Sequence, residues 1–184
     1  MPASNAFEEI AEGDCDLAEP FASSMSESLR AFGYDLPSAI ADLVDNSIFA
    51  EARSIWIDFN WDGENSSICV TDDGRGMTEK EILDAMRPGS RNPLDARDPK
   101  DLGRYGLGLK TASFSQCRRL TVRSTRKGNK ESVTRCWDLD FIREKNKWLL
   151  LRNAREQSEP CLNRLRKMNH GTSVLWEKMD RIVP

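Results

Sequence analysis

Three groups of polar and glycine residues in this 184-residue chain have types and spacings suited to chemistry. The first comprises Asp42, Asp45 and Asn46, which lie three and four positions apart in a helix-like segment. A helix over them places their oxygens together on one face. Carboxylate and carboxamide oxygens suit Mg²⁺, and a carboxylate there can orient a water molecule for attack on a phosphate. Taken alone, the pattern favours an ordinary solvated helix face.

The second group directly follows a strand-like segment and reads Asp72-Asp73-Gly74-Arg75-Gly76-Met77. A carboxylate at a strand end is a good acceptor for an amino group, such as that of adenine. Glycines beside it let the backbone approach a flat ring closely. An ordinary glycine turn is the alternative interpretation of this run.

The third group opens a predicted helix and reads Gly103-Arg104-Tyr105-Gly106-Leu107-Gly108-Leu109-Lys110. Free N–H groups at a helix N-terminus attract phosphate, the glycines allow the chain to wrap it, and Lys110 supplies a cation. A bare GxxGxG pattern is weak evidence for such a site. The segment also departs from the P-loop and from the Rossmann fingerprint.

The elements that must position these groups follow from hydrophobic periodicity and turn residues. Helices are predicted over residues 20–34, 37–52, 79–86, 105–116 and 161–168. Strands are predicted over residues 54–61, 66–71, 118–125, 131–139, 147–153 and 171–178, with a short turn at 143–146. The second helix has an apolar stripe of Ile40, Leu43, Val44 and Ile48 opposite its polar face. This order of elements indicates a two-layer α/β sandwich.

Composition and charge narrow the possible partners. The net charge of −3 shows that the chain as a whole is not basic, as many nucleic-acid-binding proteins are. The basic residues clustered between 118 and 130 are interpreted as a solvated sheet edge. Nucleic-acid binding is therefore left undecided. Residues 1–19 are acidic and expected to be flexible. The chain has no apolar run long enough for a membrane span and no N-terminal signal. Five scattered cysteines favour a reducing compartment, so we expect a cytoplasmic protein with no membrane partner.

Together the three groups match one family in order and spacing. The segment LPSAIADLVDNSIFA resembles the N box of GHKL ATPases (the class of gyrase B, MutL, MORC proteins and histidine kinases), DDGRGM resembles the G1 box and GRYGLGLKTAS the G2 box. HGTSVLW resembles the later Gly-Thr box. The resemblance spans roughly residues 22–180 and is closest to MORC-like and related bacterial ATP-binding proteins.

The resemblance implies a fold and a set of roles. It implies the Bergerat fold, an α/β (α+β) two-layer sandwich over residues 20–184 with a mixed, mostly antiparallel sheet, helices on one face and ATP on the helical side. By this likeness Asn46 binds Mg²⁺, Asp72 binds adenine, Thr172 supports adenine binding partly through water, and residues 88–103 form the ATP lid. The remaining nucleotide-binding positions are Asp45, Gly74, Gly76, Met77, Ser90, Gly103, Gly106, Leu107, Gly108, Leu109 and Lys110.

The sequence departs from the family pattern at three points. The general base of the family is commonly a glutamate, whereas this sequence has Asp42 at that position. The aspartate side chain is shorter than that of glutamate by about 1.5 Å, one carbon–carbon bond. A displacement of about 1 Å can cost on the order of a hundredfold in rate, so hydrolysis is expected to be slow. Phe49 replaces a frequent aspartate, and it either packs against a neighbouring helix or forms an apolar wall near the nucleotide. The chain ends at Pro184 without the second domain that usually supplies a lysine, so an N-terminal fragment of a longer protein with C-terminal domains is expected.

Three functions remain at this stage. The first is a Mg²⁺-dependent ATPase that acts as a conformational switch through an ATP-dependent homodimer. The second is a nucleotide-sensing interaction module without significant hydrolysis. The third, a histidine-class kinase using His170, is disfavoured because that residue precedes a strand rather than lying on a dimerising helix.

Overall fold

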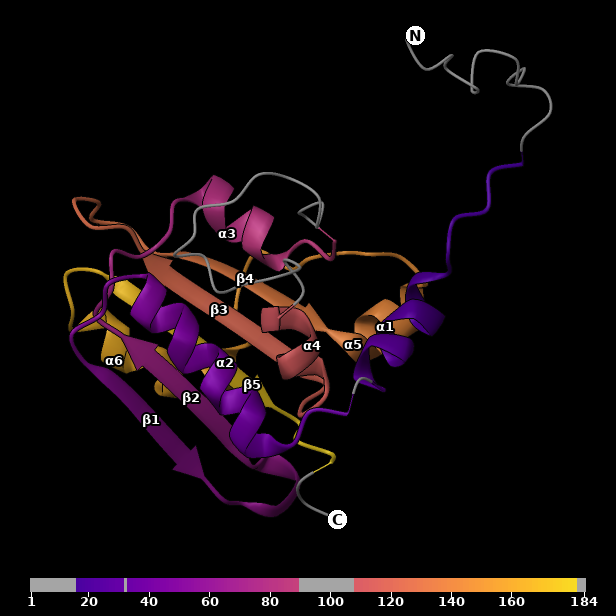
Figure 1. The fold of residues 1–184 in the computed structure, drawn as a ribbon, viewed down its shortest axis with the longest axis horizontal. Helices are drawn as coiled ribbons and strands as arrows, with labels where there is room; N and C mark the ends of the chain where they lie inside the picture. The colour runs from indigo at the N-terminus through magenta and orange to yellow at the C-terminus, as the bar shows by residue number, and fades with distance from the viewer. Residues whose placement is uncertain (1–15, 32, 90–107, 182–184) are drawn as a thin grey trace, which may run out of the picture.

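The structure is a computed structural model that describes residues 16–31, 33–89 and 108–181 (Figure 1). Its strands are β1 (Ile55–Asn60), β2 (Ser67–Asp72), β3 (Arg119–Thr125), β4 (Val133–Asp138) and β5 (Gly171–Glu177). Its α-helices are α1 (Ala22–Arg30), α2 (Leu36–Phe49), α3 (Glu79–Met86), α4 (Gly108–Phe114), α5 (Leu139–Lys145) and α6 (Asn163–Arg166). Short 3-10 turns are η2 (Gly63–Asn65), η3 (Glu156–Ser158) and η4 (Pro160–Leu162).

The strands form one sheet in the order β1-β2-β5-β3-β4. Every pairing between these described strands is antiparallel. The last strand, β5, inserts at the centre, where its register sets Thr172 opposite Asp72 of β2 and opposite Ser124 of β3. Residues far apart in sequence therefore meet at one end of the sheet.

The two faces of the sheet are covered differently. Helices α2, α3 and α4 lie in front of the sheet in Figure 1, and the main apolar core fills the space between them and the sheet. Its buried members include Leu43, Ile82, Phe114, Val122 and Trp176. A smaller cluster of Cys69, Leu162 and Leu175 lies on the opposite face, where η4 and α6 pack. The predicted α/β fold with its mostly antiparallel sheet is confirmed, and only short helices occupy the second face.

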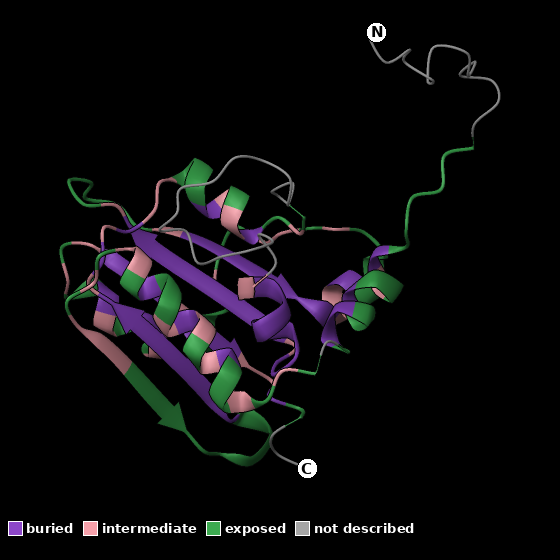
Figure 2. Cartoon of the chain, in the orientation of Figure 1, coloured by how far each residue is buried: buried purple, intermediate pink, exposed green. Residues whose placement is uncertain are grey.

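Strand β1 is an open edge of the sheet. Ile57 and Phe59 are 36% and 49% exposed, and Figure 2 shows this strand green beside the purple central strands. On its other face, Arg164 of α6 lies over the Trp56 ring at 5.4 Å and pairs with Asp58 at 2.9 Å. The opposite edge, β4, is partly covered by an isolated bridge.

The segment after β4 differs from the sequence prediction. The expected turn at 143–146 is the end of α5, which Asp138 caps by accepting from the Asp140 and Phe141 N–H groups. Asn146 ends the helix in the left-handed conformation with φ of 47°. The strand predicted over 147–153 is wrong: only Leu151 pairs there, through a bridge to Cys136.

Two further predictions about side-chain environment are wrong in part. Of the apolar stripe predicted on α2, Leu43 is buried and Ile40 packs against the core, but Ile48 is 57% exposed. The other buried residues of the helix are Ala39 and Ser47, so the buried face is turned towards them.

The prediction that the basic cluster is solvated holds for Lys127 and Lys130, which are exposed after β3, but not for the arginines within β3, because that strand lies inside the sheet. Arg119 is buried against Asp138 at 3.0 Å and Arg123 against Glu159 at 2.7 Å, so these cations are neutralised within the fold.

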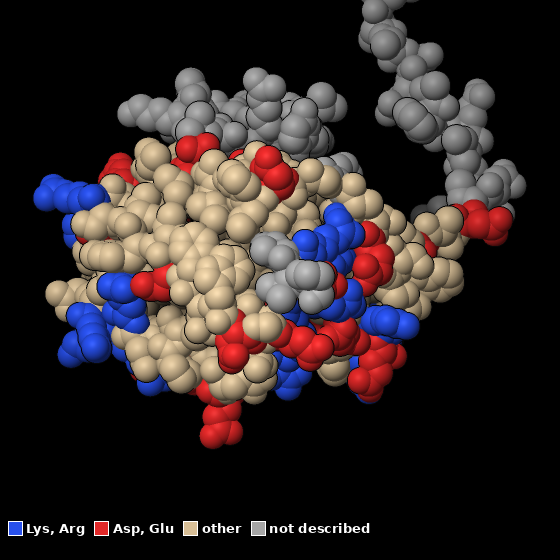
Figure 3. Space-filling model, turned by 90° about the horizontal axis from the view of Figure 1, so that it is seen from below, with Lys and Arg blue, Asp and Glu red and all other residues tan. Residues whose placement is uncertain are grey.

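The described surface carries charges of both signs. On the face seen in Figure 3, Lys and Arg atoms are interspersed with Asp and Glu atoms around a broad uncharged area. No helix within residues 16–31, 33–89 or 108–181 is both long and apolar enough to cross a membrane.

Candidate nucleotide-binding site

The predicted adenine acceptor, Asp72, is the last residue of β2 and is only 5% exposed. Its Oδ1 accepts from the Gly74 backbone N–H at 2.8 Å, and its Oδ2 accepts from the Ser47 hydroxyl at 3.1 Å. Burial raises the pKa of this carboxyl above its ordinary value, although both hydrogen bonds favour its charged form. The result is a fixed acceptor at the sheet end, with little water to compete for it.

Ser47 connects this acceptor to α2. The same hydroxyl lies 3.2 Å from the Leu43 carbonyl oxygen, one turn earlier in the helix. Pro37 and an Asp35 side chain that accepts from the Ser38 N–H start α2 at a defined place. Sequence analysis did not select Ser47, although its position four residues after Leu43 places it on the same, sheet-facing side of the helix.

Ser124 of β3 ties together the other side of the pocket. Its oxygen accepts from the Met77 backbone N–H at 2.7 Å and lies 2.9 Å from the Thr172 hydroxyl and 3.0 Å from the Gly171 carbonyl oxygen. The predicted residues Met77 and Thr172 are thus brought together by a residue that sequence analysis missed. Only the β3–β5 register reveals Ser124, since nothing in its own sequence neighbourhood marks it.

Two glycines bring the backbones at this pocket unusually close. Gly76 has φ of +65°, and a Cβ there would lie 1.9 Å from the Thr125 carbonyl oxygen. Gly171 has φ of +134°, and a Cβ there would lie 2.0 Å from the Asp72 carbonyl oxygen. Both positions therefore require glycine, which explains one glycine of the G1 box and the glycine of the Gly-Thr box in terms of packing.

The polar face of α2 lies beside the start of α4. Asp45 and Asn46 are exposed, and Asp42 is half-buried. A Cβ placed on Gly108 would lie 3.7 Å from the Asp42 Oδ2 atom, so this carboxylate adjoins the G2 glycine. The structure thus brings together the predicted base and the first described residue of the predicted phosphate loop.

Lys110 and Leu109 occupy less open positions than the phosphate loop prediction suggests. Leu109 is partly buried against the main core, and Lys110 is 2% exposed. The Lys110 ammonium donates to the Ala85 carbonyl oxygen at 2.8 Å, near the C-terminal end of α3. The other predicted phosphate-loop and lid positions lie outside the described residues: Ser90, Gly103, Gly106 and Leu107.

Comparison with known proteins shows the family of this chain. Residues 34–172 match the family model of histidine kinase-, DNA gyrase B- and HSP90-like ATPases. The chain belongs to this GHKL ATPase family. The matched range begins at Tyr34, just before α2, and ends at Thr172, so it contains the whole site.

Curated relatives of this GHKL domain are much longer proteins. It is 38% identical to ATPase morc-1 of Caenorhabditis elegans over 91 residues, which cover 50% of this chain and 10% of that protein. It is 28% identical to the chaperone protein HtpG of Francisella tularensis over 128 residues, covering 64% of this chain and 19% of HtpG. It is 30% identical to mouse MORC family CW-type zinc finger protein 3 over 79 residues, covering 42% and 8% respectively. The chain therefore spans at most about a fifth of these relatives.

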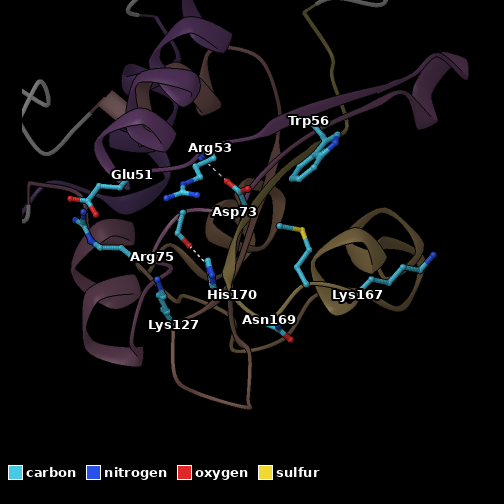
Figure 4. Close-up of a pocket in the computed structure, with 11 residues that line it drawn as sticks. Glu51, Arg53, Trp56, Asp73, Arg75, Lys127, Lys167, Asn169 and His170 are labelled. Atoms are coloured by element: carbon cyan, nitrogen blue, oxygen red, sulfur yellow. Dashed lines mark hydrogen bonds between the residues drawn. The ribbon is translucent and has the colours of Figure 1, made fainter.

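The G1 loop of the GHKL domain has a second side, away from α2's polar face. There the His170 Nδ1 atom lies 2.7 Å from the Gly74 carbonyl oxygen, at the wall of a groove of about 730 Å³ (Figure 4). Asp73 accepts from the Arg53 and Ser54 N–H groups at 2.7 and 2.8 Å, so this second carboxylate holds the loop rather than facing Asp72. His170 thus has a structural contact at the G1 loop.

Phe49, at the end of α2, has a contact that neither sequence interpretation anticipated. The Arg75 guanidinium lies over its ring at 5.0 Å and donates to the Phe49 carbonyl oxygen at 2.9 Å. The substitution therefore joins the end of α2 to the G1 loop through a cation–π contact.

Proposed function

We propose that this GHKL domain binds ATP with Mg²⁺, hydrolyses it slowly and acts as a conformational and dimerisation switch. The observation that carries the proposal is the joined geometry of the Asp72 pocket and the α2 polar face. One helix holds the acceptor through Ser47 and presents Asp42 beside Gly108. Family membership supports ATP binding in general, and the finer roles below belong to the proposal.

Adenine recognition rests on Asp72. Its oxygens accept protein hydrogen bonds from fixed directions, which leaves a lone pair for the exocyclic amino group of adenine. The Thr172 hydroxyl, oriented by Ser124, supports the same ring directly or through water. Gly74 and Gly76 allow the ring to lie close to the loop backbone.

The residues of α2 fit a magnesium nucleotide. The exposed Asn46 amide offers one neutral oxygen, a hard ligand of the kind that Mg²⁺ accepts, with Asp45 beside it on the helix. Protein Mg²⁺ sites commonly take their remaining ligands from phosphates and water. When bound, the ion neutralises charge on the phosphate oxygens. Phosphate binding is completed by Gly108 and by the loop before it.

Hydrolysis rests on Asp42. Its carboxylate accepts a proton from the water that attacks the terminal phosphate, and its short side chain keeps the reaction slow. The Lys110 ammonium donates to the Ala85 carbonyl oxygen, and an ammonium group carries further N–H donors that can serve a phosphate oxygen.

The switch depends on segments and domains beyond the described core. ATP orders the lid over residues 88–103, and the ordered state forms a homodimer within a longer, cytoplasmic parent protein. The small share of each relative that the chain covers favours C-terminal domains in that parent. The alternative is a nucleotide sensor that scarcely hydrolyses, which the short Asp42 side chain favours.

The test is ATP binding and phosphate release by the purified chain with Mg²⁺, beside an Asp42→Asn variant. We expect both proteins to bind ATP equally and only the parent to release phosphate. Binding without release by the parent selects the sensor function. Failure of the parent to bind ATP at any concentration up to millimolar refutes the proposal.

A further inference from the structure

We propose that the groove beside the G1 loop is a docking site for an acidic peptide segment of a partner protein. This groove of about 730 Å³ lies on the side of the loop away from the polar face of α2 (Figure 4). Its volume is within the usual range of sites that bind ligands. The inference goes beyond the proposed function, because docking here requires neither ATP nor Mg²⁺.

Four cationic side chains line the groove, and each comes from a different segment of the fold. They are Arg53 between α2 and β1, Arg75 of the G1 loop, Lys127 of the β3–β4 hairpin and Lys167 directly after α6. Among residues 16–31, 33–89 and 108–181, no carboxylate oxygen lies within 4.0 Å of their side-chain nitrogens. The arginines inside β3 are paired with acidic residues of the fold, whereas the groove leaves its cations to an anion from outside.

The two carboxylates of the groove lining do not cancel this charge. Asp73 accepts from the Ser54 and Arg53 backbone N–H groups at 2.8 and 2.7 Å, and these hydrogen bonds hold the pKa of its carboxyl below the ordinary value. Glu51 is the second acidic residue of the lining. Four cations against two carboxylates give the groove a net positive charge, which selects an anionic partner.

The walls of the groove are held in place before a partner arrives. The Lys127 backbone N–H donates to the Arg75 carbonyl oxygen at 2.9 Å, and the His170 Nδ1 atom lies 2.7 Å from the Gly74 carbonyl oxygen. A carbonyl oxygen only accepts, so the proton of the second contact is on Nδ1. Because these contacts already join three of the segments around the groove, docking requires little reorganisation.

The mixed lining favours a peptide over a nucleic acid. Trp56 and Met168 add apolar surface to the groove. A nucleic-acid strand carries a phosphate at every residue and would bring some of them close to Glu51 and Asp73. An acidic peptide can place its carboxylates at the cations and its apolar side chains against Trp56 and Met168. The partner segment is therefore one in which glutamate or aspartate is interspersed with apolar residues.

The test is fluorescence anisotropy of a short fluorescein-labelled peptide, rich in glutamate with leucines at intervals, added to the purified chain without nucleotide. We expect saturable binding that weakens as the salt concentration rises. Arg53→Glu and Lys127→Glu should each raise the Kd about tenfold, because each replaces an attraction by a repulsion. The matched control is Lys147→Glu, which reverses an exposed lysine outside the groove lining and should leave the Kd within about twofold.

The outcomes separate this groove from the alternatives. Absence of saturable binding in the parent overturns the proposal, and so does an unchanged Kd in Arg53→Glu and Lys127→Glu at the parent's Tm. Equal binding of a peptide with lysine in place of every glutamate overturns the role of charge. An oligothymidylate of equal charge that binds more tightly than the peptide, and is lost in both variants, overturns the peptide in favour of nucleic acid. Because no nucleotide is present, a chain that fails to bind ATP can still bind the peptide, so the two proposals fail separately.

Discussion

Replacing Asp72 by Asn should separate nucleotide affinity from folding. In the folded chain the new amide can keep its oxygen on the Gly74 N–H group, since that donor lies 2.8 Å from Oδ1. Its NH₂ group can then donate to Ser47, whose hydroxyl proton turns to the Leu43 carbonyl oxygen at 3.2 Å. The protein network is preserved, but the charged acceptor for adenine is lost.

The size of the effect follows from that one lost interaction. Hydrogen bonds to charged groups contribute about 1.5–3 kcal/mol, and every 1.4 kcal/mol is tenfold in affinity. We therefore expect the Kd for ATP, measured by isothermal titration calorimetry, to rise about 10- to 150-fold in Asp72→Asn. The matched control is Asp73→Asn, whose carboxylate contacts the backbone of residues 53 and 54 and should leave Kd within about threefold.

The stability of the nucleotide-free protein should not fall in Asp72→Asn. The pKa of Asp72 in the folded protein is raised above its ordinary value of 3.8. Its contribution to the free energy of unfolding is therefore favourable below pH 3.8, where the carboxyl is protonated, and is lost as pH rises through the folded pKa. At neutral pH the charged group is therefore unfavourable, and Asp72→Asn should show an equal or higher Tm. A Kd within threefold of the parent, in a variant with intact Tm, would refute the assignment of Asp72 to adenine.

The remaining predictions concern the fold around the site. Gly76→Ala should lower Tm, measured by differential scanning fluorimetry, by several degrees more than Gly89→Ala. Both glycines have φ near +65°, but only a Cβ at Gly76 would meet backbone atoms. Equal losses of Tm in the two variants would contradict this close contact. Glu159→Gln should cost about 0.5–1 kcal/mol, a modest value because that side chain is 32% exposed. Hydrogen bonding with Arg123 lowers the pKa of Glu159 in the folded protein. The ionised Glu159 therefore stabilises the fold above about pH 4.5, and this stabilisation is lost as pH falls through the folded pKa. If the urea midpoints of parent and variant change in parallel between about pH 3 and 7, this pH dependence is refuted. In the native chain three buried thiols should resist iodoacetamide at pH 8, as peptide mass mapping would show, because burial raises the pKa of each. They are Cys69, Cys117 and Cys136.

Local signals were sufficient for much of the fold. The helix predicted over residues 79–86 is confirmed as α3, and Thr78 and Glu81 form both hydrogen bonds of a capping box at its start. Alternation along β1 and the glycine punctuation after β2 also gave the correct elements. Each of these features is set by residues within a few positions of one another, which is why sequence reasoning reached them.

The features that sequence analysis predicted wrongly or missed depend on pairing between strands that are far apart in the sequence. The apolar run before residue 153 has strand composition, but no neighbouring strand is placed to continue a ladder with it beyond Leu151. Arg119 and Arg123 read as surface residues until the register places acidic partners beside them. Ser124 entered the site for the same reason, since its role depends on β5 arriving from the far end of the chain.

The unequal edges of the sheet have a consequence for behaviour in solution. At β4 the backbone groups of Cys136 are satisfied by Leu151, with both hydrogen bonds at 2.9 Å. At β1 the outer backbone groups face water next to exposed Ile57 and Phe59, which is the pattern that recruits another strand and leads to aggregation. Asp58, in the middle of that strand, is a charged residue of the kind that opposes such pairing, and its ion pair with Arg164 holds α6 beside this edge. Protection of the β1 edge against pairing with another strand therefore depends in part on its contact with α6.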